Sequence, residues 1–212
     1  MAEAAILRVR HCGAAIFCRR APERCPACGR SLRGAGLSAA PLRLPSPFRH
    51  GHRQPRAFLL RPTAGTFLGG YDGKSDLHVG ITNSNGVVYN YSAEGVERAE
   101  VGWEQCISIP LVQPDMFQLL QRWDELLEEF STGEAWLPHR YEEQNHNCYM
   151  YALAFINSVL TAQGKHQMSK SEFTEKFVIP QTRRASRYIT LHQALAANEF
   201  YIVPLPEPEK QC

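Results

Sequence analysis

Two residues in this 212-residue chain could act as nucleophile and base, Cys148 and His78. Cys148 follows Asn147, a favoured N-cap residue, and begins an apolar run that predicts a buried helix over residues 148–162. A sulfur at a helix N-terminus lies beside unpaired N–H groups and the positive end of the helix dipole, which favour thiolate over thiol. A nearby imidazole would shuttle the proton during acyl transfer, and His78 is the candidate for that role.

The element that must position His78 is a β-hairpin. Residues 76–82 alternate between apolar and polar as a half-buried strand does, residues 83–86 read Asn-Ser-Asn-Gly, and residues 87–91 form the returning strand. Asn90, on the returning strand, is the candidate third residue that orients His78, provided that the strand register turns it toward the ring.

Other residues near Cys148 offer alternative roles. His139 and His146 are alternatives to Asn90 as the third catalytic residue. Gln144 or Asn147 could donate into an oxyanion hole together with the backbone N–H of Cys148.

A second group of reactive residues lies near the N-terminus, where Cys25-Pro-Ala-Cys28-Gly29 has the spacing of a zinc knuckle. A tetrahedral ion needs two more ligands, and His11, Cys12 and Cys18 are the candidates. Adjacent strand residues point in opposite directions, so His11 and Cys12 can bind together only if the backbone bends there. Zinc in this position would be structural, the alternative being unligated cysteines in a marginal N-terminal arm, and no organic cofactor is expected.

Composition places the chain among soluble globular proteins. It contains 44% hydrophobic residues, and no run is long and apolar enough to predict a membrane span. The N-terminus meets a charge too early for a signal peptide, so we expect an intracellular protein, cytoplasmic or nuclear or both. The odd number of cysteines, seven, favours thiols or metal ligands over a disulfide framework.

Charge divides the chain unevenly. Residues 1–71 hold 12 basic and 2 acidic residues, which leaves 11 basic and 19 acidic residues for positions 72–212. A basic arm could contact an acidic protein partner, although a solvated Pro-rich segment accounts for the arginines without one, and we do not expect a nucleic-acid partner.

We expect four regions and an α+β fold. They are a zinc-knuckle-like element over 1–30, a flexible basic linker over 31–57, an α+β domain over 58–204 and a tail over 205–212.

Further elements follow from local patterns. Residues 6–18 suffice for two short strands, residues 105–112 for a strand that ends before Pro114, and residues 201–203 for a last strand. Residues 114–130 predict an amphipathic helix whose acids, from Asp124 to Glu129, form a solvated face. Two capping boxes, Ser169 with Glu172 and Thr190 with Gln193, predict two more helix starts.

The joint pattern of a His strand followed by an Asn-Cys helix resembles the circularly permuted papain-like superfamily. The segments that carry this likeness are Leu77–Ile81 and Asn147–Tyr151, within residues 70–163. It is similar to PPPDE-type isopeptidases and to lecithin:retinol acyltransferase and NlpC/P60-like enzymes. The resemblance implies a papain-like domain with a cysteine nucleophile.

Over nearly its whole length the chain resembles the makorin-2 opposite-strand protein family. The segments that carry this resemblance are 60–67, 75–83, 86–92, 135–141 and 147–148. The family has no assigned reaction. Its pattern includes the His-Cys pair and the Cys-Pro-x-Cys-Gly element, which implies the zinc ligand set His11, Cys12, Cys25 and Cys28.

Two functions follow as hypotheses. As an enzyme, the chain would attack an amide, isopeptide or thioester carbonyl through Cys148, with His78 as general base and Asn90 orienting it. As a non-catalytic protein, it would keep the papain-like scaffold and bind a protein partner through the basic arm or the zinc element. The sequence does not specify a substrate or an oligomeric state.

Overall fold

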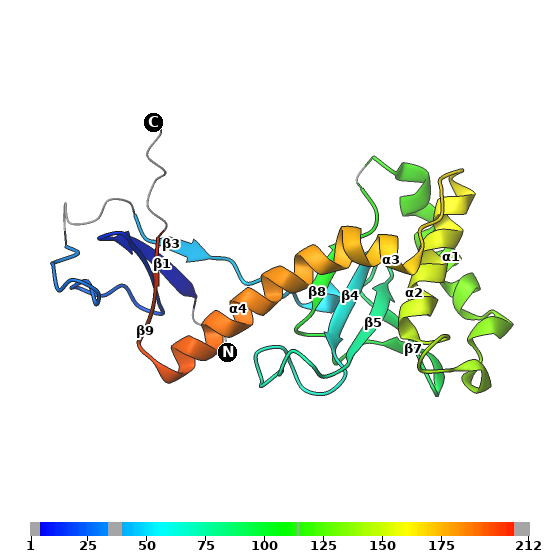
Figure 1. Cartoon of the computed structure of the whole chain (residues 1–212). Coiled ribbons are helices and arrows are strands. Elements are labelled where there is room, and N and C mark those ends of the chain that lie inside the picture. The colour runs from blue at the N-terminus through cyan, green and yellow to red at the C-terminus, as the bar shows by residue number, and fades with distance from the viewer. Residues whose placement is uncertain (1–4, 34–39, 114, 206–212) are drawn as a thin grey trace. The chain divides into compact units, whose positions relative to one another are not determined.

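The computed structural model describes residues 5–33, 40–113 and 115–205, and divides the chain into two compact units. The central unit is Pro47–Ala185, and the terminal unit combines Met1–Ser46 with Ser186–Cys212. Both contain an antiparallel sheet and helical residues, so the predicted α+β class is confirmed (Figure 1).

A five-stranded antiparallel sheet in the order β7-β6-β5-β4-β8 forms the centre of the central unit. Its strands are β4 (Ala57–Pro62), β5 (Leu77–Thr82), β6 (Val88–Ser92), β7 (Gly95–Ala99) and β8 (Ile107–Pro110). The predicted hairpin is the β5–β6 pair, and its turn is held by the Asn83 side chain, whose Oδ1 accepts from the N–H groups of Asn85 and Val87. The predicted strand over 105–112 is β8, and Pro114 lies outside the described residues.

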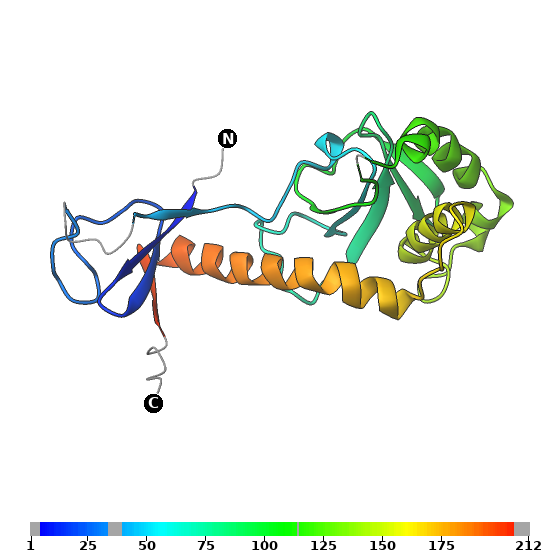
Figure 2. The ribbon, with the colours of Figure 1, turned by 90° about the horizontal axis from the view of Figure 1, so that it is seen from above.

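Helices α1 (Phe117–Ser131) and α2 (Cys148–Ala162) run side by side next to this sheet (Figures 1 and 2). The remaining helical segments are η2 (Gly51–Arg53), η3 (Glu134–Trp136), η4 (Pro138–Arg140), α3 (Lys170–Phe173), the π-helical turn η5 (Thr174–Val178) and α4 (Ile179–Ala197). Among the described residues, none of these helices is long and apolar enough to cross a membrane.

Two acids of α1 do not form the solvated face that the amphipathic pattern predicts. Asp124 accepts hydrogen bonds from the backbone N–H and the hydroxyl of Ser84, in the hairpin turn. Glu128 accepts from the Tyr89 hydroxyl at 2.8 Å and pairs with Arg98. These side chains reach sheet residues far away in sequence, which helical periodicity does not report.

Alternation along β4 and β5 gives the sheet two distinct faces. Phe58 is the Cα partner of Ile81, and the centroid of its ring lies 5.8 Å from that of Tyr149 in α2. The next pair, Leu59 with Gly80, projects to the other face, where Trp103 packs so closely that a Cβ on Gly80 would lie 3.1 Å from its ring. We call these the helix face and the Trp103 face.

The terminal unit contains a four-stranded sheet in the order β3-β1-β2-β9. Its strands are β1 (Ile6–His11), β2 (Ala14–Cys18), β3 (Leu42–Leu44) and β9 (Phe200–Pro204). The two strands predicted within residues 6–18 and the strand predicted at 201–203 are therefore present. A small core of Val9, Ile16, Cys18, Cys25 and Leu32 packs on one face, with Phe200 against it.

The structure groups residues differently from the expected regions. The expected linker, 31–57, supplies β3 and then a segment of the central unit, where Phe48 is buried and stacks on Phe67. Residues 200–204, expected in the domain over 58–204, pair with β2 in the terminal unit. Composition identified 31–57 as Pro- and Gly-rich, but these contacts join residues that are distant in sequence. Residues 34–39 and 206–212 of the expected linker and tail lie outside the described residues.

One predicted helix start is correct and the other is wrong. Ser169 and Glu172 form a reciprocal capping box at the start of α3. Thr190 instead lies inside α4, where its hydroxyl donates to the carbonyl of Ser186 at 3.1 Å, one turn earlier. A Thr hydroxyl inside a helix can donate its hydrogen bond to the carbonyl four residues earlier, so the capping-box motif alone does not mark the start of a helix.

We expect Gly86→Ala to destabilise the central unit strongly. Gly86 has φ +85°, and a Cβ there would lie 2.0 Å from the carbonyl oxygen of His52. The control is Gly102→Ala, because Gly102 has φ +86° and open space around it. This variant should lose only the free energy of holding alanine in the left-handed backbone conformation, about 1–2 kcal/mol. Gly86→Ala should lose roughly 1–3 kcal/mol more through overpacking, measured by urea unfolding. Equal losses in the two variants would contradict the close approach of His52.

Candidate functional site

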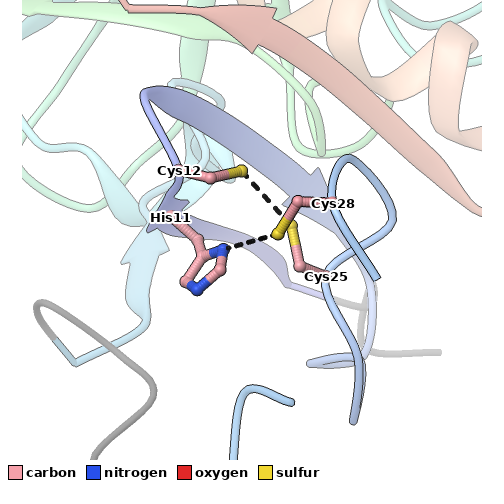
Figure 3. A group of neighbouring side chains, drawn as sticks. All are labelled: His11, Cys12, Cys25 and Cys28. Atoms are coloured by element: carbon pink, nitrogen blue, oxygen red, sulfur yellow. Dashed lines mark hydrogen bonds between the residues drawn. The ribbon is translucent and has the colours of Figure 1, made fainter. Parts of the chain in front are cut away.

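Four side chains that can ligate a metal converge in the terminal unit. One ligand atom from each of His11, Cys12, Cys25 and Cys28 lies within 4.8 Å of all the others (Figure 3). The Cys12 and Cys25 sulfurs are 3.6 Å apart, and the Cys28 sulfur is 3.5 Å from Nδ1 of His11. The set expected from the sequence and the family resemblance is therefore brought together.

A tight turn between β1 and β2 makes it possible for two adjacent residues to contribute. His11 pairs with Ala14, so the hairpin loop is Cys12-Gly13, with φ +43° and +75°. Positive φ at both central residues is the signature of a type I′ turn. The turn ends the strand alternation and lets His11 and Cys12 face the same point. Gly13, next to Cys12 between two alternating segments, was a signal for this bend that our sequence reasoning did not use.

The other two ligands come from a knuckle formed by residues 25–29. The N–H of Gly29, at φ +74°, donates to the carbonyl of Cys25 at 2.8 Å, and the N–H of Cys25 donates to the carbonyl of Arg30 at 2.8 Å. These bonds curl the segment so that both sulfurs point toward the β1–β2 turn (Figure 3).

The dimensions and donors of the cluster fit zinc. Zn–S distances of about 2.3 Å in a tetrahedron place ligand sulfurs about 3.8 Å apart, close to the observed 3.6 Å between Cys12 and Cys25. Three thiols and one imidazole are a common ligand set for structural zinc. Cys18, the alternative ligand, is fully buried in the small core and is not part of the cluster.

The cluster also separates the acidities of its thiols. Burial opposes ionisation of Cys25, but the N–H groups of Ala27 and Cys28 and hydrogen bonds with the Cys28 and Cys12 thiols outweigh it and lower the pKa of Cys25 to about 6. Desolvation, then hydrogen bonds and repulsion from Cys25 and Cys28, raise the pKa of Cys12 to about 11. The first negative charge of the metal-free cluster therefore lies on Cys25.

Cys148 lies at the start of α2, as predicted, with Asn147 as N-cap. Asn147 Oδ1 accepts from the N–H groups of Tyr149 and Met150, and its Nδ2 donates to the carbonyl of Glu143, so this side chain is used for capping. Burial raises the pKa of Cys148, and hydrogen bonds from the N–H groups of Val79 and Tyr149 oppose this only in part. At neutral pH the side chain is therefore a thiol, contrary to the expectation from its helix position.

His78 and Asn90 are brought together as the sequence reasoning expected. Nε2 of His78 lies 2.8 Å from Oδ1 of Asn90, so a neutral ring donates to the amide oxygen. Burial lowers the pKa of His78, the Asn90 bond opposes the shift, and the nearby Arg61 adds to it. The ring also lies 5.8 Å from that of Trp103, which places it on the Trp103 face.

Cys148 and His78 are not joined by a hydrogen bond among the described residues. Strand alternation gives the reason. The helix that carries Cys148 packs on the helix face, together with Phe58 and Ile81, whereas His78 projects with Gly80 to the Trp103 face. A catalytic Cys148–His78 pair is thus not formed by a hydrogen bond of the described residues, and it stays a prediction of the sequence.

The alternative histidines have other surroundings. His146 stacks on Trp136 at 4.7 Å, and its Nε2 lies 2.7 Å from the carbonyl of Ala135. His139 lies in the exposed segment η4, and Gln144 is exposed in the loop before α2.

Two family models match the sequence. The model described as DUF4796 N-terminal covers residues 4–32, and the one described as DUF4796 C-terminal covers residues 41–195. MKRN2 opposite strand protein from Homo sapiens is 54% identical over 207 residues, which cover 98% of this chain and 93% of the relative. No solved structure matches the chain. The family resemblance seen in the sequence is thus confirmed.

We expect alkylation of Cys148 to be slow at neutral pH. A raised pKa leaves little thiolate, so the rate with iodoacetamide should rise with pH through a midpoint above the free-thiol value of about 8.5. Peptide mass spectrometry of the intact chain measures the rate for Cys148 separately from other thiols. A midpoint below that value would contradict the dominance of burial over the helix N-terminus.

Proposed function

We propose, starting from the fact that this chain belongs to the DUF4796 family, that it is a zinc-binding, non-catalytic interaction protein. In this proposal a structural zinc ion holds the terminal unit together, and that unit meets a protein partner. The observation that carries the proposal is the convergence of His11, Cys12, Cys25 and Cys28 within 4.8 Å.

One core cluster of the terminal unit consists of five buried side chains. The knuckle that contributes Cys25 to this cluster, residues 25–29, contains no helix or strand. Small domains of this kind usually need a metal or disulfide to supplement their core. A zinc ion would tie the β1–β2 turn to the knuckle, and Cys25, which also belongs to the core, would link both.

The charge of this unit supports a protein partner that carries acidic groups. Arg20, Arg24 and Arg30 are exposed around the knuckle, and Glu23 is the only acid within residues 5–33. Glu23 pairs with Arg33, which leaves an excess of positive charge on this segment. Opposite charges steer association and favour specific partners more than they add affinity. For the central unit, the papain-like scaffold suggested by the His-strand and Cys-helix order remains part of the proposal.

Metal analysis tests the zinc assignment. Chain purified with zinc should hold about one ion per molecule, and Cys25→Ser and Cys28→Ser should each lose most of it, because a tetrahedral site tolerates few missing thiolates. The matched control is Cys18→Ala, which removes a thiol from the same sheet but outside the cluster. Wild-type chain without zinc, or zinc lost equally from Cys18→Ala, would contradict the assignment.

A second candidate function is a thiol hydrolase or acyltransferase that uses Cys148. It is favoured by one specific observation, the His78–Asn90 hydrogen bond of 2.8 Å, which is the pairing that orients a general base. It requires a rearrangement that brings the Cys148 thiol to the other ring nitrogen of His78, Nδ1.

An acyl probe tests this second candidate. A reactive thioester should acylate Cys148 in the wild-type chain, detected as a mass increase on its peptide, and His78→Ala should slow this at least about 100-fold if His78 acts as base. The control Cys148→Ser shows which peptide signal belongs to this residue. Equal acylation of wild type and His78→Ala would exclude His78 as the base.

A further inference from the structure

The outer edge of β9 is an unprotected part of the terminal unit. Within the described residues, β9 pairs only with β2, so it is one edge of the sheet. Its side chains Tyr201, Ile202 and Val203 are 39%, 39% and 37% exposed, although all three are apolar or aromatic. An exposed edge strand presents unpaired N–H and C=O groups to which another strand can bind.

The hydrogen-bond pattern shows which groups point outward. The N–H of Leu205 donates to the carbonyl of Gly13 at 2.7 Å, so this pair faces inward. In an antiparallel ladder the backbone N–H and C=O groups of successive residues point alternately to one side and the other. The backbone groups of Tyr201 and Val203 therefore point toward β2, where their partners are Phe17 and Ala15. The outward backbone groups therefore belong to Phe200, Ile202 and Pro204, of which the proline has no N–H.

The strand carries no charge that would repel an identical strand. Between Glu199 and Glu207 the sequence contains only uncharged residues. The opposite edge, β3, is shorter and carries Arg43 at its centre. Natural edge strands are usually protected by charges, and β9 has only Pro204 at its end.

We propose that β9 pairs antiparallel with β9 of a second copy of this chain, joining two terminal sheets into one. A two-fold axis at Ile202 gives every outward N–H a carbonyl. Ile202 donates to Ile202 of the other copy, and Phe200 donates to Pro204, so the missing proline N–H removes none of these bonds. Tyr201 then lies opposite Val203, an aromatic and β-branched pair that stabilises neighbouring strands.

Because the β9 edge is uncharged, it matches the equally uncharged edge of a second copy better than it matches a charged strand. In the two-fold register Glu199 lies opposite Leu205, so no two acids face each other. A charged partner strand would find no opposite charge on this edge. The paired edge lies close to the proposed zinc site, because the N–H of Leu205 donates to the carbonyl of Gly13, beside the ligand turn, and Phe200 packs on the core that contains Cys25. The pairing itself goes beyond the zinc function and does not require a bound metal.

Sedimentation equilibrium of the zinc-loaded full chain tests this pairing. The wild-type mass should reach twice 23.9 kDa at micromolar concentration. Ile202→Lys places two ammonium groups beside the axis and should weaken the dimer about tenfold or more. The matched control is Leu42→Lys on the opposite edge, where Leu42 is 49% exposed, and it should leave the dimer unchanged.

Hydrogen exchange gives a second readout, which reports on the wild-type dimer directly. In the wild-type dimer the outward amides of Phe200 and Ile202 should exchange slowly, like the inward amides of Tyr201 and Val203. In Ile202→Lys only the inward pair should stay slow. A dimer in which the outward amides exchange at the unprotected rate would overturn the pairing.

Metal content measured on the same samples separates this proposal from the zinc function. A zinc-loaded monomer would overturn the β9 pairing and leave the zinc site intact. A metal-free dimer with protected Phe200 and Ile202 amides would overturn the zinc function and support the pairing.

Discussion

Side-chain alternation along β-strands decides which reactive groups of this protein can meet. His11 and Cys12 are neighbours in sequence and would face opposite ways on a regular strand. The left-handed backbone of Cys12 and Gly13 interrupts the alternation, and both ligands reach one point. Along β5 the alternation is uninterrupted, so His78 and Val79 face opposite sides and the Cys148 helix lies on the side of Val79. One constraint thus assembles the His/Cys cluster, and it leaves the Cys148 thiol and the His78 imidazole without a hydrogen bond between them.

A second physical balance acts at Cys148 itself. A helix N-terminus stabilises negative charge through its free N–H groups, and Asn147 leaves the N–H of Cys148 available while it caps those of Tyr149 and Met150. The same apolar sequence that makes α2 a good helix also buries its first residue, which is 8% exposed. Desolvation of a thiolate costs more than a few N–H dipoles return, so the pKa of Cys148 rises.

Local features of the fold could be predicted from the sequence. The β5–β6 hairpin depends on the alternation of its strands and on Asn83, and α2 depends on an apolar run after an Asn cap, so neither needs information from elsewhere in the chain. The His/Cys cluster was predicted because two of its members form a knuckle and the family pattern supplied the others. The Asn90 contact with His78 was also foreseen, since both lie on one hairpin.

Features that depend on distant partners could not be predicted in this way. The pattern at Thr190 satisfies a capping rule, yet helix α4 continues through it because neighbours such as Ile189 and Leu195 are buried there. Phe48 lies in a Pro-rich segment that looks like a linker, and only its stacking on Phe67 assigns it to the central unit. Asp124 and Glu128 looked like solvated acids until Ser84 and Tyr89 provided their partners.

The pairing of β9 with β2 brings residues 14–18 and 200–204 into one sheet. Closing a long loop costs entropy that grows only with the logarithm of its length, so a distant strand can be recruited by modest contacts. Those contacts are five residue pairs with β2, the Leu205–Gly13 bond and Phe200 against the small core. All of them require that the β1–β2 hairpin is already in place. The turn residues Cys12 and Gly13 therefore contribute to the position of a strand almost two hundred residues away. A metal ion held at that turn would stabilise β1, β2 and β9 together.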